Sequence, residues 1–313
     1  MLSLSLSLAC APSNPTVPPP VVSSTAWDPD APLADRCFDG IGDGSVPQYD
    51  AFGPVVPRDC MGTDHQDITA LDRLVFVGDS VTAGTPPTPA SGVYRALLSE
   101  SLGDVFGTLE VADCSRWGAR ADDLVRDDDQ LVECLGTGVD PRATLVVFTI
   151  GGNDLMAISE RLMDGASSEE VQPEIDEVIA TFAGALDWLV DARARFPSGL
   201  YVVFGDVYEY TDGTGDLASC PAAELLGFAG EVPEARAAAI QVNEAWVRLA
   251  TERGFDVAFL LEWFCGHGFY ADDPTNECWR GPGTERWFDD SCIHPNPAGH
   301  AQIAEMFHTI VTR

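Results

Sequence analysis

The chain of 313 residues contains no lysine, because its 17 lysine-plus-arginine positions are all arginine. This absence excludes the lysine chemistry of phosphate-binding P-loops, Schiff bases and lysine nucleophiles. Positive charge is scarce overall, since 50 acidic residues give a formal net charge of −33 at pH 7. A field of that sign repels nucleic-acid phosphates and anionic lipid headgroups, so we expect no nucleic-acid partner.

The sequence also lacks Cys-x-x-Cys pairs, which argues against zinc ribbons and thioredoxin-like sites. Nine cysteines are nevertheless present. Without Cys10 an even number remains, which fits up to four disulfides formed in an oxidising compartment. The alternative is a metal site at Cys265 and His267, but no second close pair of ligands accompanies these residues. We therefore expect disulfides and no metal.

The N-terminal segment, residues 1–10, predicts export. It alternates Leu and Ser and is too short to span a bilayer, which takes about 20 apolar residues. Its Leu-Ala-Cys ending resembles a bacterial lipoprotein signal, in which the cysteine, here Cys10, becomes lipidated. We expect an exported protein, either a cell-envelope lipoprotein attached to the membrane through Cys10 or a secreted protein. A disordered cytosolic N-terminus is the alternative.

Two further segments precede the main body of the chain. Residues 11–34 are rich in Pro, Ser and Val and favour an extended, polyproline-like tether. Residues 35–68 are rich in Gly, Asp and Pro and carry Cys37 and Cys60, so we expect a disulfide-stapled extension there. The catalytic domain is predicted at residues 69–313.

This last region alternates predicted strands with predicted helices. Short apolar runs, which predict strands buried on both faces, lie at 74–77, 109–111, 145–148, 200–204 and 257–260. Helical periods recur at 175–189 and 242–249, and a last helix is predicted from Pro297 to the C-terminus. The pattern predicts an α/β fold, a three-layer α/β/α sandwich with a flavodoxin-like parallel sheet of about five strands.

Polar motifs follow the first three strands and precede the last helix. They place Ser80 in a Gly-Asp-Ser block, Gly118 after the second strand, Asn153 in a Gly-Gly-Asn-Asp block and His294 in a His-Pro-Asn block. Ligands of such sheets bind at the carboxyl ends of the strands, so we expect these residues to form a site there. Asp79, beside the serine, is expected to bond backbone around the turn.

With all four blocks in this order, the chain resembles the SGNH (GDSL) hydrolase family from about residue 73 to the C-terminus, in particular its bacterial esterase and phospholipase branch. The resemblance implies that Ser80 is the nucleophile and His294 the base. It also implies an oxyanion hole formed by the N–H groups of Ser80 and Gly118 and the side chain of Asn153. An imidazole with a pKa near 6.5 suits the role of base, and this chemistry needs no metal or cofactor.

The group that orients His294 has three candidates. The family usually places an acid three residues before the histidine, and that position holds Ser291 here. Asp290 is one residue further back and Asp289 two, and a backbone carbonyl is the remaining candidate. We expect a local bulge to bring Asp290 onto the histidine.

The function predicted on these grounds is the hydrolysis of carboxylic esters through an acyl-serine, with acyl or lipid-like esters favoured. The alternatives are a polysaccharide O-acetyl esterase and a non-catalytic surface binding lipoprotein on the same scaffold. The expected partner is a small-molecule or lipid ester, and we expect a monomer. The acidic turn at residues 212–216 is predicted to border the site.

Overall fold

The computed structural model describes residues 47, 49–52, 60–126 and 130–313. The chain separates into two units, residues 1–31 and 32–313. The predicted signal segment and tether, Cys10 and Cys37 lie outside the described residues, so the domain boundaries proposed there stay predictions.

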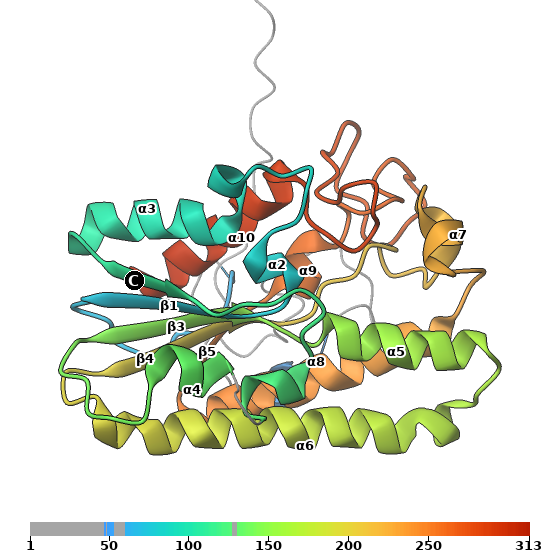
Figure 1. Cartoon of the computed structure of the whole chain (residues 1–313). Coiled ribbons are helices and arrows are strands. Elements are labelled where there is room, and N and C mark those ends of the chain that lie inside the picture. Colours follow the sequence, from blue (N-terminus) through green and yellow to red (C-terminus); the bar gives the residue numbers. More distant parts are fainter. Residues whose placement is uncertain (1–46, 48, 53–59, 127–129) are drawn as a thin grey trace, which may run out of the picture. The chain divides into compact units, whose positions relative to one another are not determined.

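A five-stranded, all-parallel sheet forms the centre of the described region (Figure 1). Its strands are β1 (Arg73–Gly78), β2 (Glu110–Asp113), β3 (Thr144–Thr149), β4 (Leu200–Gly205) and β5 (Asp256–Ala258). Their spatial order is β2-β1-β3-β4-β5. This is the flavodoxin-like order, in which ligands bind where the strand order reverses, here between β1 and β3. The predicted fold class is confirmed.

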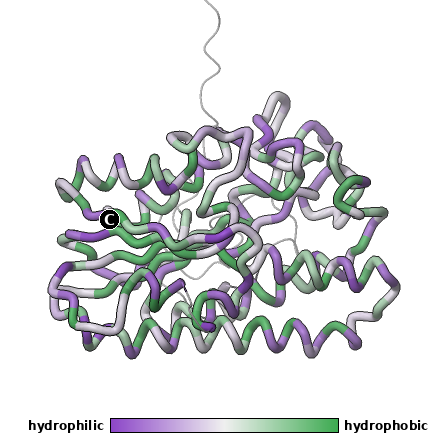
Figure 2. The backbone as a smooth tube through the Cα atoms, viewed as in Figure 1, coloured by the Kyte–Doolittle hydropathy of each residue, from purple (hydrophilic) through white to green (hydrophobic). Residues whose placement is uncertain are grey.

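The strands differ in burial. All residues of β1 and β3 are buried, and Figure 2 shows the hydrophobic residues concentrated along the central strands. The prediction of burial on both faces is wrong for β2, whose residues are mostly exposed because it forms an edge of the sheet. Leu260, predicted at the end of the last strand, instead begins a helix.

Helices cover both faces of the sheet. They are α2 (Ser80–Ala83), α3 (Tyr94–Phe106), α4 (Gln130–Leu135), α5 (Gly152–Met163), α6 (Ser168–Ala192), α7 (Ala223–Leu226), α8 (Pro233–Arg253), α9 (Leu260–Phe264) and α10 (Pro297–Val311). Helices α3 and α10 pack together on one face, and α6 and α8 pack together on the other (Figure 1). The helices predicted at 175–189, at 242–249 and from Pro297 are confirmed.

Aromatic rings join the helical layer to the sheet. The rings of Phe182 in α6 and Trp246 in α8 stack with their centroids 4.1 Å apart. Both lie edge-on to Phe204 of β4, which itself stacks on Phe148 of β3 at 5.3 Å. All four side chains are fully buried. Large buried rings in such contacts contribute strongly to stability, so this cluster fixes α6 and α8 against the strands that lead to the site.

The described cysteines are oxidised, as predicted. Three disulfides join Cys114 to Cys134, Cys220 to Cys292 and Cys265 to Cys278, and Cys60 is also disulfide-bonded. The metal-site alternative for Cys265 is therefore wrong, and His267 instead stacks on Trp287. Within the described ranges no group of three or more His, Cys, Asp or Glu side chains is arranged to hold a metal ion. The helices of this same region include none with the length and apolarity that a membrane span needs.

Candidate active site

The predicted site residues lie at the carboxyl edge of the sheet, close to the point where the strand order reverses. Ser80 begins α2 directly after β1, with Asp79 as the N-cap of that helix. Asn153 lies in the first turn of α5, directly after β3. His294 lies in the loop before α10. Three segments far apart in the sequence therefore supply polar side chains to one place.

A hydrogen bond joins Ser80 to His294. The serine Oγ lies 2.9 Å from Nε2 of the imidazole. Burial lowers the pKa of His294, and the negative charge of Asp289 opposes that effect only in part. Because the ring is neutral at pH 7, its Nε2 can accept the serine proton. A hydroxyl bonded to a neutral imidazole is the arrangement that activates a serine for attack.

The loop that carries Gly118 is fastened to the start of α5. Asn153 Nδ2 donates to the carbonyl oxygen of Ala119 at 2.8 Å, and the N–H of Ala121 donates to Asp154 Oδ2 at 3.0 Å. The first bond uses one of the two N–H groups of the amide, so the other can serve a ligand. Gly118 is exposed and has a φ of +78°, a conformation that strains any residue with a side chain.

The expectation that Asp290 reaches His294 is wrong. The Asp290 carboxylate accepts a hydrogen bond from Arg286 at 2.8 Å, and its side chain is 78% exposed. The group that lies 3.0 Å from His294 Nδ1 is the hydroxyl of Ser291. That hydroxyl donates to Asp289 Oδ1 at 2.5 Å.

A local turn explains why Ser291, and not Asp290, contacts His294. Asp289 Oδ1 also accepts the backbone N–H of Ser291 at 2.8 Å, which makes an Asx turn. This turn directs Ser291 toward the imidazole and leaves Asp290 at the surface. The Asp-x-Ser spacing is the signal in the sequence that favours such a turn.

An apolar pocket opens beside Ser80 and His294. It has a volume of about 150 Å³. Much of its apolar lining lies on α5, α8 and the segment between β4 and α8, and includes Leu155, Met156, Leu217, Phe228, Ala235 and Ala239. The predicted acidic turn borders it, since Gly215 of that turn contributes to the lining, as does Thr211 directly before it.

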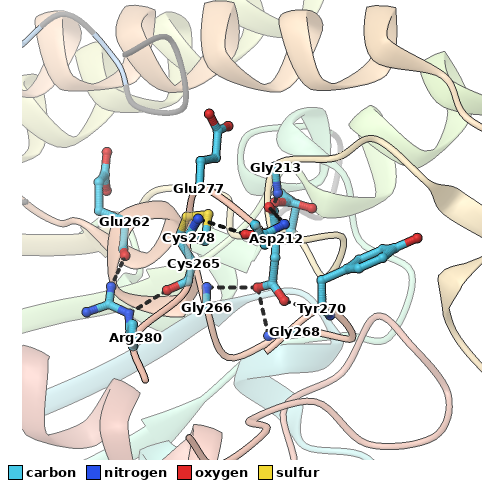
Figure 3. Close-up of a disulfide and its surroundings, with 12 residues drawn as sticks. Asp212, Gly213, Glu262, Cys265, Gly266, Gly268, Tyr270, Glu277, Cys278 and Arg280 are labelled. Carbon is cyan, nitrogen blue, oxygen red and sulfur yellow. Dashed lines mark hydrogen bonds between the residues drawn. A yellow bond between two sulfur atoms is a disulfide. The ribbon is translucent and has the colours of Figure 1, made fainter. Parts of the chain in front are cut away.

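The wall that carries this turn is held by one buried carboxylate (Figure 3). Asp212 accepts hydrogen bonds from the backbone N–H groups of Gly266, Gly268 and Tyr270 at 2.8, 2.8 and 2.9 Å. The Cys265–Cys278 disulfide closes the same loop. Backbone bonds and the crosslink therefore shape the wall where regular secondary structure is absent.

Comparisons with known proteins agree with this fold. A family model described as the GDSL-like lipase/acylhydrolase family matches residues 76–302. No curated protein matches the chain.

Three solved structures share the fold at low sequence identity. A phospholipase A1 from Streptomyces albidoflavus is 19% identical, with a TM-score of 0.52 over 77% of this chain and 99% of that chain. An extracellular lipase from Streptomyces rimosus is 21% identical, with a TM-score of 0.50 over 76% and 99%. A catalytic mutant of an acetylxylan esterase from Geobacillus stearothermophilus is 15% identical, with a TM-score of 0.51 over 79% and 97%.

Proposed function

The chain belongs to the GDSL-like lipase/acylhydrolase family, and we propose that it hydrolyses carboxylic esters through an acyl-enzyme formed on Ser80. The observation that carries the proposal is the 2.9 Å contact between Ser80 Oγ and His294 Nε2 at an apolar pocket. A non-catalytic binding protein on this scaffold would not require that contact.

The reaction begins with attack of Ser80 Oγ on the ester carbonyl carbon, while the serine proton passes to His294 Nε2. The electron pair of the C=O bond moves onto its oxygen and gives a tetrahedral intermediate. When the intermediate collapses, the C–O bond to the alcohol breaks and the leaving alcohol takes the proton from Nε2. Water then repeats the sequence on the acyl-serine and releases the acid.

Three donors are proposed to stabilise the oxyanion. The N–H of Ser80 has no partner within α2 because Ser80 is the first residue of that helix, and the N–H of Gly118 lies in the loop fastened to α5. The remaining amide N–H of Asn153 is the third. Removal of one such donor typically costs about 10²–10³-fold in rate.

The pocket favours acyl or lipid-like esters as substrates. A cavity of about 150 Å³ is far larger than the roughly 10–15 Å³ that one water molecule needs, so it can accept more than the methyl of an acetyl group. Its lining includes apolar side chains of α5 and α8, and contact with them would contribute about 25 cal/mol for each Å² of acyl chain removed from water. The alternative is an O-acetyl esterase acting on a polysaccharide, for which most of this apolar surface would be unnecessary.

We propose that the protein is exported. The oxidised cysteines support this, because disulfides persist in oxidising compartments. Attachment through a lipidated Cys10 and a monomeric state stay predictions. Replacement of Cys10 by serine should release the protein from the membrane fraction. A Cys10→Ser variant that stays in the membrane fraction would contradict attachment through Cys10.

A fluorophosphonate probe and a panel of esters test the proposed function. The probe should label the wild type on Ser80, Ser80→Ala should lose both labelling and activity, and Ser99→Ala on α3 should keep both. Activity on p-nitrophenyl esters from acetyl to palmitoyl should exceed activity on acetylated xylan. Ala239→Phe should narrow the pocket and lower kcat/KM for long chains more than for acetyl. Preference for acetylated xylan would favour the O-acetyl esterase, and labelling that survives in Ser80→Ala would refute the nucleophile.

A further inference from the structure

Ser291 lies between the imidazole of His294 and a buried carboxylate. Its Oγ is 3.0 Å from His294 Nδ1 and 2.5 Å from Asp289 Oδ1. A hydroxyl donates one hydrogen bond and accepts others, and an ionised carboxylate only accepts. The direction of the chain is therefore fixed: Nδ1–H donates to the serine Oγ, and the serine O–H donates to Asp289. This direction leaves Nε2 without a hydrogen and facing Ser80.

We propose that Ser291 and Asp289 form a relay that positions His294 and transmits the charge of the buried carboxylate to it, in place of a direct contact between carboxylate and imidazole. The proposal rests on the ester hydrolysis proposed above. Both members are positioning residues, since neither touches the substrate.

The relay moves no proton of its own. When the proton of Ser80 passes to Nε2, the imidazolium keeps its Nδ1 hydrogen and Ser291 keeps its hydroxyl hydrogen, so no proton is transferred to Asp289. Positive charge on the ring polarises both hydrogen bonds of the chain, and each strengthens the other. The protonated ring is thereby stabilised in the step in which it forms.

The charges around His294 support this assignment. Asp289 is 5% exposed, and its second oxygen, Oδ2, has no hydrogen-bond partner among the described residues. All the hydrogen bonding of this carboxylate is therefore directed through Oδ1 to Ser291. Its charge raises the pKa of His294 against the larger lowering by burial. The charge of His294 also acts on His300, whose pKa burial lowers to about 4, so His300 is neutral near pH 7.

The loop is also built to hold Ser291 in place. The N–H of Asp289 donates to the carbonyl oxygen of His294 at 2.9 Å, which closes the loop between them. Cys292, directly after the serine, has a φ of +77° and is crosslinked to Cys220. The Asx turn at Asp289 by itself would serve only the shape of the loop, so the test must separate shape from charge.

Four variants separate the two roles. Ser291→Ala deprives Nδ1–H of its acceptor and should lower kcat by about 10²-fold with little change in KM. Asp289→Asn keeps an oxygen for the turn but removes the charge, and should lower kcat by about 10–10²-fold. Ser291→Thr keeps a hydroxyl and should retain activity within about tenfold. In a relay that acts in series, the double variant Ser291→Ala with Asp289→Asn should be about as slow as the slower single variant.

The pH profile gives a second readout. Loss of the Asp289 charge should lower the pKa of His294 further, so the acid limb of kcat/KM should move to lower pH in Asp289→Asn. The matched control is Asp290→Asn, which changes the neighbouring exposed carboxylate and should leave kcat and the acid limb unchanged within about threefold.

The outcomes distinguish the relay from the proposed function. Fluorophosphonate labelling of the wild type reports on the function alone, and a wild type that neither labels nor hydrolyses esters would refute both. With an active wild type, the relay is overturned by multiplicative losses in the double variant, by an unmoved acid limb in Asp289→Asn, or by a larger loss in Asp290→Asn than in Asp289→Asn. Should Ser291→Ala fail to fold, Asp289→Asn and Ser291→Thr still decide the matter.

Discussion

The carboxyl group of Asp79, next to the proposed nucleophile, should make the stability of the protein depend on pH. Asp79 is 4% exposed, and its Oδ1 accepts hydrogen bonds from the N–H of Val81 and the hydroxyl of Thr149, both at 3.0 Å. Burial outweighs these bonds and raises the pKa of Asp79 to about 7. Asparagine has the same shape and keeps an oxygen acceptor, so Asp79→Asn removes the ionisation and preserves the contacts.

The sign and size of the effect follow from linkage. A carboxyl group whose pKa is higher in the folded than in the unfolded protein contributes stability that is fully present below the unfolded value of 3.8 and is lost as pH rises through the folded value of about 7. Between pH 5 and pH 8 the unfolded chain is ionised throughout, while the folded protein holds the proton for about two of those three pH units. At about 1.4 kcal/mol per unit, the Asp79 contribution to the free energy of unfolding falls by about 3 kcal/mol.

Urea denaturation at pH 5 and pH 8, at equal ionic strength, measures this contribution. The stability difference between Asp79→Asn and the wild type should move by about 3 kcal/mol in favour of the variant at pH 8, since the other titrating groups cancel in the comparison. Asp104→Asn, an exposed change on α3, serves as the control and should move by less than about 0.5 kcal/mol. A difference for Asp79→Asn that is the same at both pH values would refute the reasoning, because the carboxyl would then ionise in the folded protein as it does in the unfolded chain.

Two further predictions concern the supports of the site. Asp154→Ala leaves the buried N–H of Ala121 without its acceptor and should lower kcat by about 10–10²-fold with little change in KM. The control is Asp123→Ala, which removes the acceptor of the Arg120 N–H at the turn of residues 121–124 and should leave kcat within about threefold of the wild type. Equal losses in the two variants would contradict a role for the hydrogen bond between this turn and α5. Replacing both Cys220 and Cys292 by alanine removes a crosslink across 72 residues and should cost about 4 kcal/mol of unfolding free energy, and a loss below about 1 kcal/mol by urea denaturation would contradict the entropic account.

The fold could be predicted from the sequence because burial and periodicity coincide in its centre. The runs at β1, β3 and β4 are continuous in hydrophobicity, as parallel strands covered on both faces require. The same reasoning failed for β2, because an apolar run does not tell which strand will form the edge of the sheet. That position depends on the order of the strands, which is set by packing between distant segments.

Some residues of the site could likewise be predicted from the sequence, and others could not. Ser80 and Asn153 could be placed because each directly follows a strand, and topology then brings them to one edge of the sheet. The hydrogen-bond partner of His294 could not be predicted, because it depends on the direction in which a loop turns. Neighbours in sequence such as Asp289 and Asp290 face the ring or the solvent according to one Asx turn.

The segments that decide the substrate are the ones that sequence patterns describe least. Two of the pocket's apolar side chains, Leu217 and Phe228, come from the segment between β4 and α8, where helices are only a few residues long. The shape of that segment depends on Asp212, whose partners lie more than fifty residues further along the chain, and on the Cys220–Cys292 crosslink. That crosslink joins the pocket wall to the loop of the proposed base. A change in the wall that alters substrate preference should therefore also shift the position of His294. We expect acyl-chain selectivity and the pH dependence of kcat/KM to change together in variants of this crosslink.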